Sequence, residues 1–182
     1  MRLFIAIDLP SDIKAAFDRE NRKLRPLCSR GSFSREENLH LTLCFIGETG
    51  PDNLAAVTEA MDSVTSPPIL LTIGDPGMFR SREGGTLWRS VDGGAYLAVL
   101  QSSLSDALSK AGFAKETRRY TPHLTVARRV KLREGVTQRS LSAGFTPLSF
   151  TASEITLFLS EQKNGRRVYT PLYRKELTGS GS

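Results

Sequence analysis

The chain has 182 residues, of which 39% are hydrophobic and 24% charged, and this composition is that of one ordinary soluble globular domain. No stretch is long and apolar enough to cross a membrane, and Cys28 and Cys44 have no metal-ligand spacing, which argues against a membrane protein and a cysteine metal site. The net charge of +6 favours polyanionic partners, although scattered surface charge is weak support by itself.

The first half of the chain predicts strands and helices in alternation. Residues 2–9 are rich in Phe and Ile and end at Pro10, which predicts a strand. This run is too short for a secretion signal, so we expect a cytoplasmic protein. Ser11 stands at an N-cap position, and helical spacing continues to about residue 25. Further strands are expected at 39–46, 69–73 and 86–91, and a second helix at 51–64.

The second half repeats this order. Residues 96–111 have leucines at helical spacing, 123–130 predict a strand, and an Asn-Gly turn at 164–165 predicts a hairpin whose last strand continues through residue 177. Strands joined by short turns favour an α+β fold with antiparallel sheets. The similarity of the halves predicts a pseudo-twofold duplication in one domain of two packed lobes, residues 1–177. Residues 178–182 are expected to be a flexible tail or a cloning remnant.

The only two histidines of the chain stand in the same pattern, HLTL at residues 40–43 and HLTV at residues 123–126. Residues i and i+2 of a strand share a face, so His40 projects beside Thr42, and His123 beside Thr125. One such motif is more often structural, but two copies that use all the histidine favour function. Two histidines without a third ligand fall short of a zinc site, so no metal and no other cofactor is expected.

These two pairs suit phosphodiester hydrolysis. Imidazole titrates near neutral pH, so one ring can take a proton from water while the other gives a proton to the leaving oxygen. The threonine hydroxyls can donate hydrogen bonds to the non-bridging phosphate oxygens and hold the phosphorus between the rings. The residues alone do not distinguish the acid from the base.

With these motifs, the sequence resembles the RNA 2′,3′-cyclic phosphodiesterases, or 2′-5′ RNA ligases, of the 2H phosphoesterase superfamily. The resemblance covers nearly the whole chain. It rests on the two HxTx motifs within NLHLTL at 38–43 and PHLTVAR at 122–128, with support from FIAIDLP at 4–10, FIGE at 45–48 and YTPL at 169–172.

The resemblance implies a bilobal fold with one HxT strand from each lobe in a central cleft. It implies metal-independent hydrolysis of RNA 2′,3′-cyclic phosphate ends to 2′-phosphates, with reverse 2′-5′ ligation also attributed to the family. By the same resemblance His40 is the proton donor, His123 is the proton acceptor, and Thr42 and Thr125 bind the phosphate.

Other residues are candidates for substrate contact. Arg128 matches a family position that contacts phosphate, or is a surface charge. Phe45 stacks on a base or, as we slightly prefer, packs in the core. Arg80 and Arg82 form a basic lip for RNA before the Gly84-Gly85 turn. Trp88 and Tyr120 are weaker candidates, since most aromatic residues in strands serve packing.

Two alternative functions remain open at this point. One is a 2H hydrolase that acts on a small cyclic nucleotide, which comparison of mononucleotide and oligonucleotide rates would reveal. The other is a basic RNA-binding module without turnover, against which the intact motifs argue. The protein is expected to be a monomer that acts on RNA with 2′,3′-cyclic phosphate ends and not at a membrane.

Overall fold

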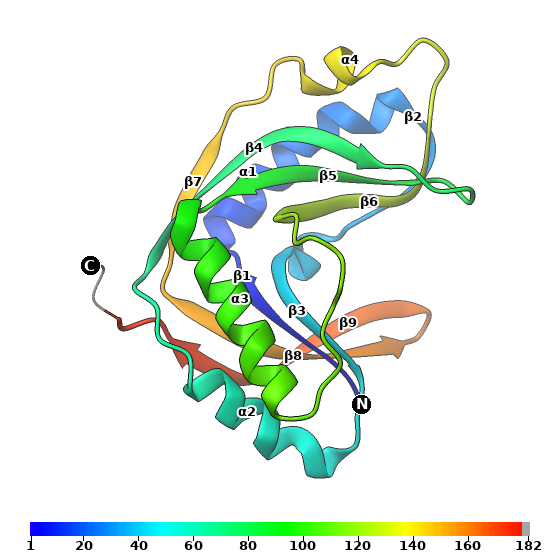
Figure 1. The fold of residues 1–182 in the computed structure, drawn as a ribbon. Coiled ribbons are helices and arrows are strands. Elements are labelled where there is room, and N and C mark those ends of the chain that lie inside the picture. The colour runs from blue at the N-terminus through cyan, green and yellow to red at the C-terminus, as the bar shows by residue number, and fades with distance from the viewer. Residues whose placement is uncertain (180–182) are drawn as a thin grey trace.

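The computed structural model describes residues 1–179, which fold into two antiparallel sheets covered by helices (Figure 1). The first sheet has the order β3-β1-β8-β9 and consists of β1 (Arg2–Asp8), β3 (His40–Glu48), β8 (Glu154–Lys163) and β9 (Arg166–Glu176). The second sheet has the order β2-β6-β5-β4-β7 and consists of β2 (Cys28–Phe33), β4 (Ile69–Phe79), β5 (Gly85–Asp92), β6 (His123–Leu132) and β7 (Leu148–Ala152). The predicted α+β class with two antiparallel sheets is confirmed.

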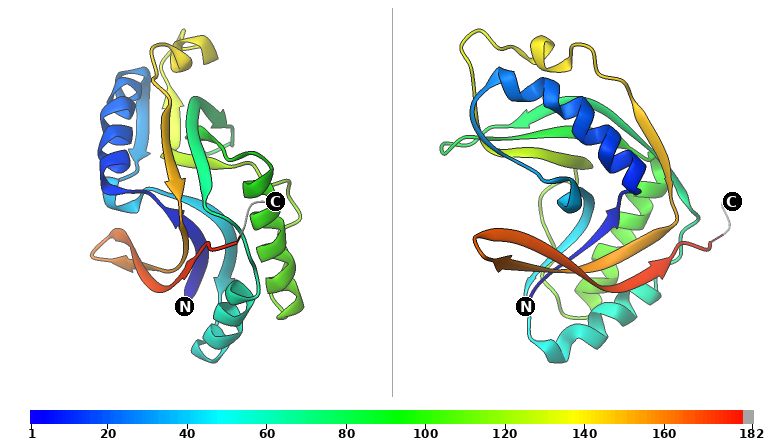
Figure 2. Two further views of the ribbon diagram at one scale, coloured as in Figure 1. Left: turned by 90° about the vertical axis from the view of Figure 1, so that its left-hand side faces the viewer. Right: turned by 180° about the vertical axis from the view of Figure 1, so that it is seen from behind.

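Two long helices each pack on the sheet that does not contain the strand preceding them in the chain. Helix α1 (Ser11–Asn21) follows β1 of the first sheet but contacts β7 of the second, whereas α3 (Gly94–Lys110) follows β5 of the second sheet and contacts β3 of the first. Helix α2 (Leu54–Asp62) packs on α3 and contacts β9, and Figure 2 shows α1 and the α2–α3 pair on opposite sides of the molecule. One hydrophobic core cluster accordingly contains residues from both sheets.

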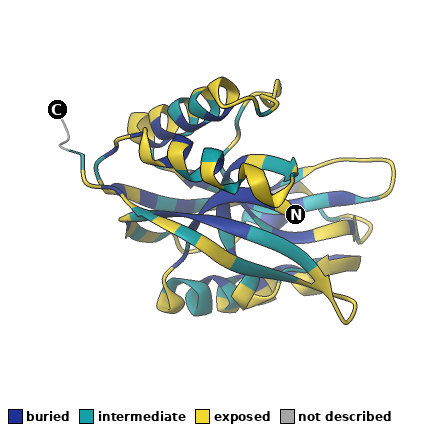
Figure 3. Cartoon of the chain, turned by 90° about the horizontal axis from the view of Figure 1, so that it is seen from below, coloured by how far each residue is buried: buried dark blue, intermediate teal, exposed yellow. Residues whose placement is uncertain are grey.

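Strand β1 is buried on both of its faces, which explains its nearly continuous apolar sequence. Leu3, Ile5 and Ile7 enter the main core beneath the helices. Phe4 and Ala6 point the other way and join a smaller apolar cluster with residues of β8 and β9. In Figure 3 the buried residues lie mainly along the strands, while the hairpin tips and the outer sides of the helices are exposed. The first sheet therefore has an apolar floor on the side away from its helices.

Several local predictions differ from the structure. Helix α1 begins at Ser11 itself, with Pro10 as its N-cap, so the N-cap expected at Ser11 is wrong. The α-helix ends at Asn21, after which η1 (Arg22–Leu27) continues as a 3-10 helix that contains Pro26. The segments absent from the prediction are β2, β7, α4 (Gln138–Ser142) and η2 (Glu36–Asn38), whereas η3 (Pro51–Asn53) is the first turn of the helix predicted at 51–64.

The end of the chain passes close to the segment between α2 and β4. The backbone N–H of Gly179 donates a hydrogen bond of 2.9 Å to the Ser66 carbonyl. Residues 180–182, part of the predicted tail, lie outside the described residues.

Candidate active site

The two HxT strands, β3 and β6, come from different sheets and contact each other beside a cleft of about 420 Å³. Its lining comprises Ser32, Phe33, Ser34, Arg35, Asn38, His40, Thr42, His123, Thr125, Arg128, Arg129, Gln162, Gly165, Arg166, Arg167 and Tyr169. All four residues of the predicted acid, base and phosphate-binding set are therefore brought together. None of the described residues that line the cleft is acidic, so its charge is strongly positive.

Each imidazole is held by a backbone carbonyl two residues upstream. His40 Nδ1 lies 2.8 Å from the Asn38 oxygen, and His123 Nδ1 lies 2.7 Å from the Thr121 oxygen. Because a carbonyl oxygen only accepts hydrogen bonds, Nδ1 carries the hydrogen in both rings. Nε2 is then the nitrogen that can accept or donate the exchanged proton.

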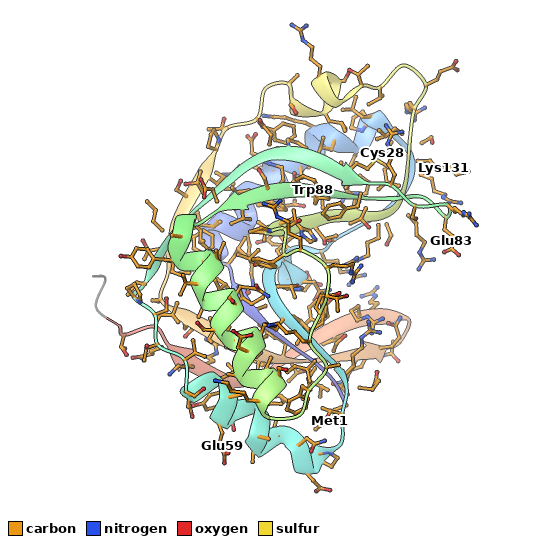
Figure 4. All side chains as sticks on the ribbon, viewed as in Figure 1. Met1, Cys28, Glu59, Glu83, Trp88 and Lys131 are labelled. Atoms are coloured by element: carbon orange, nitrogen blue, oxygen red, sulfur yellow. The ribbon has the colours of Figure 1, made fainter. Side chains whose placement is uncertain are left out.

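Aromatic rings fix the plane of each imidazole. The His40 ring lies 4.8 Å from Phe4 and meets Tyr169 edge-on, with 5.0 Å between centroids. The His123 ring meets Phe79 edge-on at 5.0 Å and lies 6.3 Å from Trp88. Both rings are thus positioned by packing as well as by a hydrogen bond, which is the preorganisation that proton transfer requires. Trp88, labelled in Figure 4, acts as packing behind His123.

Burial makes the protonated form of both histidines unfavourable. It lowers the pKa of His40 to about 4, against smaller raising effects of the Asn38 carbonyl and the Asp8 carboxylate. Burial also lowers the pKa of His123, and the Thr121 carbonyl partly opposes this. The Arg128 charge lowers the pKa of both rings. Both imidazoles are therefore mainly neutral at pH 7 in the free protein, and an anion bound between them would raise both pKa values.

The backbone carbonyls of the two threonines accept hydrogen bonds from neighbouring hydroxyl groups. The Tyr120 hydroxyl donates to the Thr42 carbonyl at 3.1 Å, and the Ser34 hydroxyl donates to the Thr125 carbonyl at 2.8 Å. Within residues 1–179, neither threonine hydroxyl has a hydrogen bond to the protein, so both can donate to an anion in the cleft. Tyr120 therefore contributes to the site by positioning Thr42.

The two strands share the same irregularity. The pairing of β1 with β3 skips Leu43, and the pairing of β5 with β6 skips Val126, so each strand has an extra residue three positions after its histidine. Such a β-bulge shifts the alternation of side chains by one. The residue five positions after each histidine, Phe45 or Arg128, therefore returns to the exposed side.

These β-bulges determine where the two candidate residues Phe45 and Arg128 lie. Phe45 is 60% exposed, with its ring 6.2 Å from that of Phe4, so the preferred interpretation as a core residue is wrong. Phe45 does not line the cleft itself but lies on the sheet face that carries His40. Arg128 does line the cleft, where its charge acts on both imidazoles. The duplication thus presents an aromatic ring in one lobe and a guanidinium in the other.

Comparison with known proteins identifies the family of the chain. A family model described as the 2′-5′ RNA ligase superfamily matches residues 12–164. The chain belongs to the 2′-5′ RNA ligase superfamily. It is 33% identical to the RNA 2′,3′-cyclic phosphodiesterase of Escherichia coli (strain K12), with 97% of each chain covered. It is 30% identical to that of Geobacillus stearothermophilus, over 93% of this chain but only 54% of that relative. The crystal structure of E. coli LigT in apo form matches with a TM-score of 0.83, 29% identity and 98% of each chain covered.

The arginines that line the cleft of this superfamily member differ in part from those that were predicted to contact RNA. Arg80 and Arg82 lie in or beside the β4–β5 turn, which Glu83 marks in Figure 4, and they do not line the cleft. The cleft also contains four arginines that were not predicted to line it, Arg35, Arg129, Arg166 and Arg167. The signal for the last two was present, because they directly follow the Asn-Gly turn that predicted the β8–β9 hairpin.

Among residues 1–179, there is no group of three or more His, Cys, Asp or Glu side chains suited to holding a metal ion. In the same part of the chain, the helices are all too short or too polar to span a bilayer.

Proposed function

We propose that this superfamily member is an RNA 2′,3′-cyclic phosphodiesterase that hydrolyses cyclic phosphate ends of RNA to 2′-phosphomonoesters without a metal ion. The observation that carries the proposal is that two oriented imidazoles and two threonine hydroxyls share one positively charged cleft. An acid, a base and two donors to phosphate oxygens are the groups that this hydrolysis needs. The activity named for the relatives with about 30% identity supports the same substrate.

In the proposed reaction, the cyclic phosphate lies between the two rings. His123 Nε2 accepts a proton from water, whose oxygen forms a bond to phosphorus while the bond from phosphorus to the 3′ oxygen breaks. His40 Nε2 donates its proton to that departing 3′ oxygen, so the phosphate stays on the 2′ oxygen. Thr42 and Thr125 donate to the non-bridging oxygens, and Arg128 balances their charge.

The proton on His40 has to be explained, because its pKa is about 4 in the free protein. A phosphodiester carries one negative charge, and its binding beside the ring favours the imidazolium. Asp8, which pairs with His40 across the two strands, acts in the same direction. In this proposal, substrate binding itself raises the pKa of His40 and so protonates it.

The proposal also includes the oligomeric state, the cellular compartment and the reverse reaction. The protein is proposed to act as a monomer, since the cleft of a single chain holds an acid, a base and two donors to phosphate. Cys28 and Cys44 are both free, as expected for a cytoplasmic protein. In the reverse reaction, the same groups would join a 2′,3′-cyclic end to a 5′ hydroxyl as a 2′-5′ linkage.

Hydrolysis in the presence of a chelator tests the proposal. Incubation of a 2′,3′-cyclic-ended oligonucleotide with the protein and excess EDTA is expected to give complete conversion to the 2′-phosphate. Phosphorus NMR measures both the loss of the cyclic phosphate and the hydroxyl that keeps the phosphate. A requirement for added metal would contradict the metal-independent mechanism, and a 3′-phosphate product would contradict the assigned leaving group. Tight binding of the oligonucleotide without any product would instead indicate an RNA-binding module.

The pH profile should report the lowered histidine pKa values. The profile of kcat/KM reflects the free protein, in which one ring must be protonated and the other neutral. Because the pKa of His40 is about 4 and that of His123 lies below 6.5, both limbs of the bell are expected below pH 6.5. The profile of kcat should move to higher pH, because bound substrate raises both pKa values. A kcat/KM optimum above pH 7 would contradict this electrostatic account.

A further inference from the structure

We propose that the β8–β9 hairpin forms a second phosphate subsite, in which Arg166 and Arg167 bind the RNA backbone on the 5′ side of the reacting end. This inference rests on the proposed function and narrows its substrate class to oligonucleotides with at least one internal phosphodiester. The terminal cyclic phosphate would occupy the histidines and threonines, and the preceding phosphate would lie against the hairpin.

The charge of the cleft exceeds what one cyclic phosphate needs. Five arginines line it, from β6, from the hairpin and from the segment after β2: Arg35, Arg128, Arg129, Arg166 and Arg167. None of the described lining residues is acidic, and a cyclic phosphate carries a single negative charge. Each internal phosphodiester of an RNA chain adds one more negative charge for a guanidinium to bind. An oligonucleotide therefore complements this cleft better than a mononucleotide does.

The arginines divide into two groups by the elements that carry them. Arg128 stands on β6, the strand of His123, and its charge lowers the pKa of both imidazoles. Arg166 and Arg167 line the same cleft from the β8–β9 hairpin, which carries neither histidine. A phosphate bound at the hairpin is therefore a different one from the phosphate between the rings.

The hairpin is fixed relative to His40 by one residue, Asn38. The Asn38 side-chain amide donates to the Arg167 carbonyl at 3.0 Å, and the Asn38 carbonyl accepts from His40 Nδ1 at 2.8 Å. Tyr169, two residues after Arg167, meets the His40 ring edge-on. Asn38 and Tyr169 therefore hold the hairpin in a fixed position relative to the acid, as a subsite for a neighbouring phosphate requires.

The two arginine side chains themselves are available for a ligand. Both residues are exposed, and neither forms an ion pair with any described residue. The Arg167 side chain donates a hydrogen bond of 3.3 Å to the Ser160 hydroxyl. They follow directly on Asn164 and Gly165, which both have positive φ, as in the tight turn that ends a hairpin with adjacent strands. Both residues thus line the rim of the cleft without an acidic partner among the described residues.

The test compares substrates of different length in matched variants. In Arg166→Ala/Arg167→Ala, kcat/KM for a 2′,3′-cyclic-ended trinucleotide should fall about 10- to 100-fold, as expected for one or two lost charged hydrogen bonds. For a nucleoside 2′,3′-cyclic monophosphate, it should change by less than about twofold, since no internal phosphate is present. The control Arg139→Ala/Arg174→Ala removes the same charge from exposed positions outside the cleft and should leave both rates unchanged.

A neutral linkage locates the subsite on the RNA. Replacing the internal phosphate nearest the cyclic end by a methylphosphonate should lower the wild-type rate by a similar factor and should have no further effect in the hairpin variant. The salt dependence of trinucleotide binding should also weaken, by about 0.7 in log–log slope for each lost phosphate contact. An equal loss on both substrates, or no loss on either, would overturn the subsite.

Binding separates the failure of this inference from failure of the proposed function. The probe is a trinucleotide that ends in a 2′-phosphate, and its dissociation constant is measured for the wild type, the hairpin variant and the control. Weaker binding in the hairpin variant alone supports the subsite even if the wild type hydrolyses nothing. Unchanged binding overturns the subsite even if hydrolysis of cyclic ends is established.

Discussion

His40→Ala and His123→Ala are each expected to lower kcat on a 2′,3′-cyclic-ended oligonucleotide by about 10²- to 10⁴-fold, the usual contribution of a positioned general acid or base. Each substitution removes an Nε2 that the cleft presents to the phosphate and leaves the opposite ring in place. The double variant should be little slower than the slower single variant, because an acid and a base that act in one step are not additive.

The controls for these variants follow from the packing of the rings. Each imidazole contacts aromatic side chains at the cleft, so alanine removes contacts but exposes no new buried charge. Thermal unfolding should therefore shift by only a few degrees, consistent with about 1 kcal/mol. Affinity for the 2′-phosphate product should change much less than kcat. Full activity in either single variant would rule out paired acid and base catalysis.

The fold could be predicted from the sequence where one face of an element dominates its pattern. Strands β3 and β6 alternate regularly around their histidines, and α3 repeats leucine at helical spacing, so all three were predicted. Strand β2 was missed because four of its six residues are exposed and it contains glycine. The exchange of α1 and α3 between the sheets depends on tertiary packing, which local periodicity does not encode.

The site could be predicted only in part for a similar reason. The HxT pairs were visible because i and i+2 geometry is local. The bulges at Leu43 and Val126 reverse that alternation, and no residue type marked them, so Phe45 was assigned to the core. Arg166 and Arg167 reach the cleft only because β9 pairs with β8 in the lobe of His40, a contact between distant segments.

The identity of the acid can be decided with a substrate whose 3′ oxygen is replaced by sulfur. A thiolate leaves without protonation, because a thiol is far more acidic than a sugar hydroxyl and has a pKa of about 8.5. The 3′-thio cyclic phosphate should therefore restore His40→Ala to near the wild-type rate, a gain of about 10²- to 10⁴-fold. It should leave His123→Ala impaired, since water must still lose its proton. The ratio of variant to wild-type kcat on the two substrates is the measurement.

This experiment matters because the resting electrostatics do not by themselves favour His40 as the acid. Burial lowers the pKa of His40 to about 4, whereas the lowering at His123 is smaller, so a proton added to the empty cleft would prefer His123. The proposed order therefore requires the substrate charge, with Asp8, to reverse this preference on binding. Rescue of His123→Ala and not of His40→Ala would show that substrate binding does not reverse this preference. His123 would then be the acid and His40 the base.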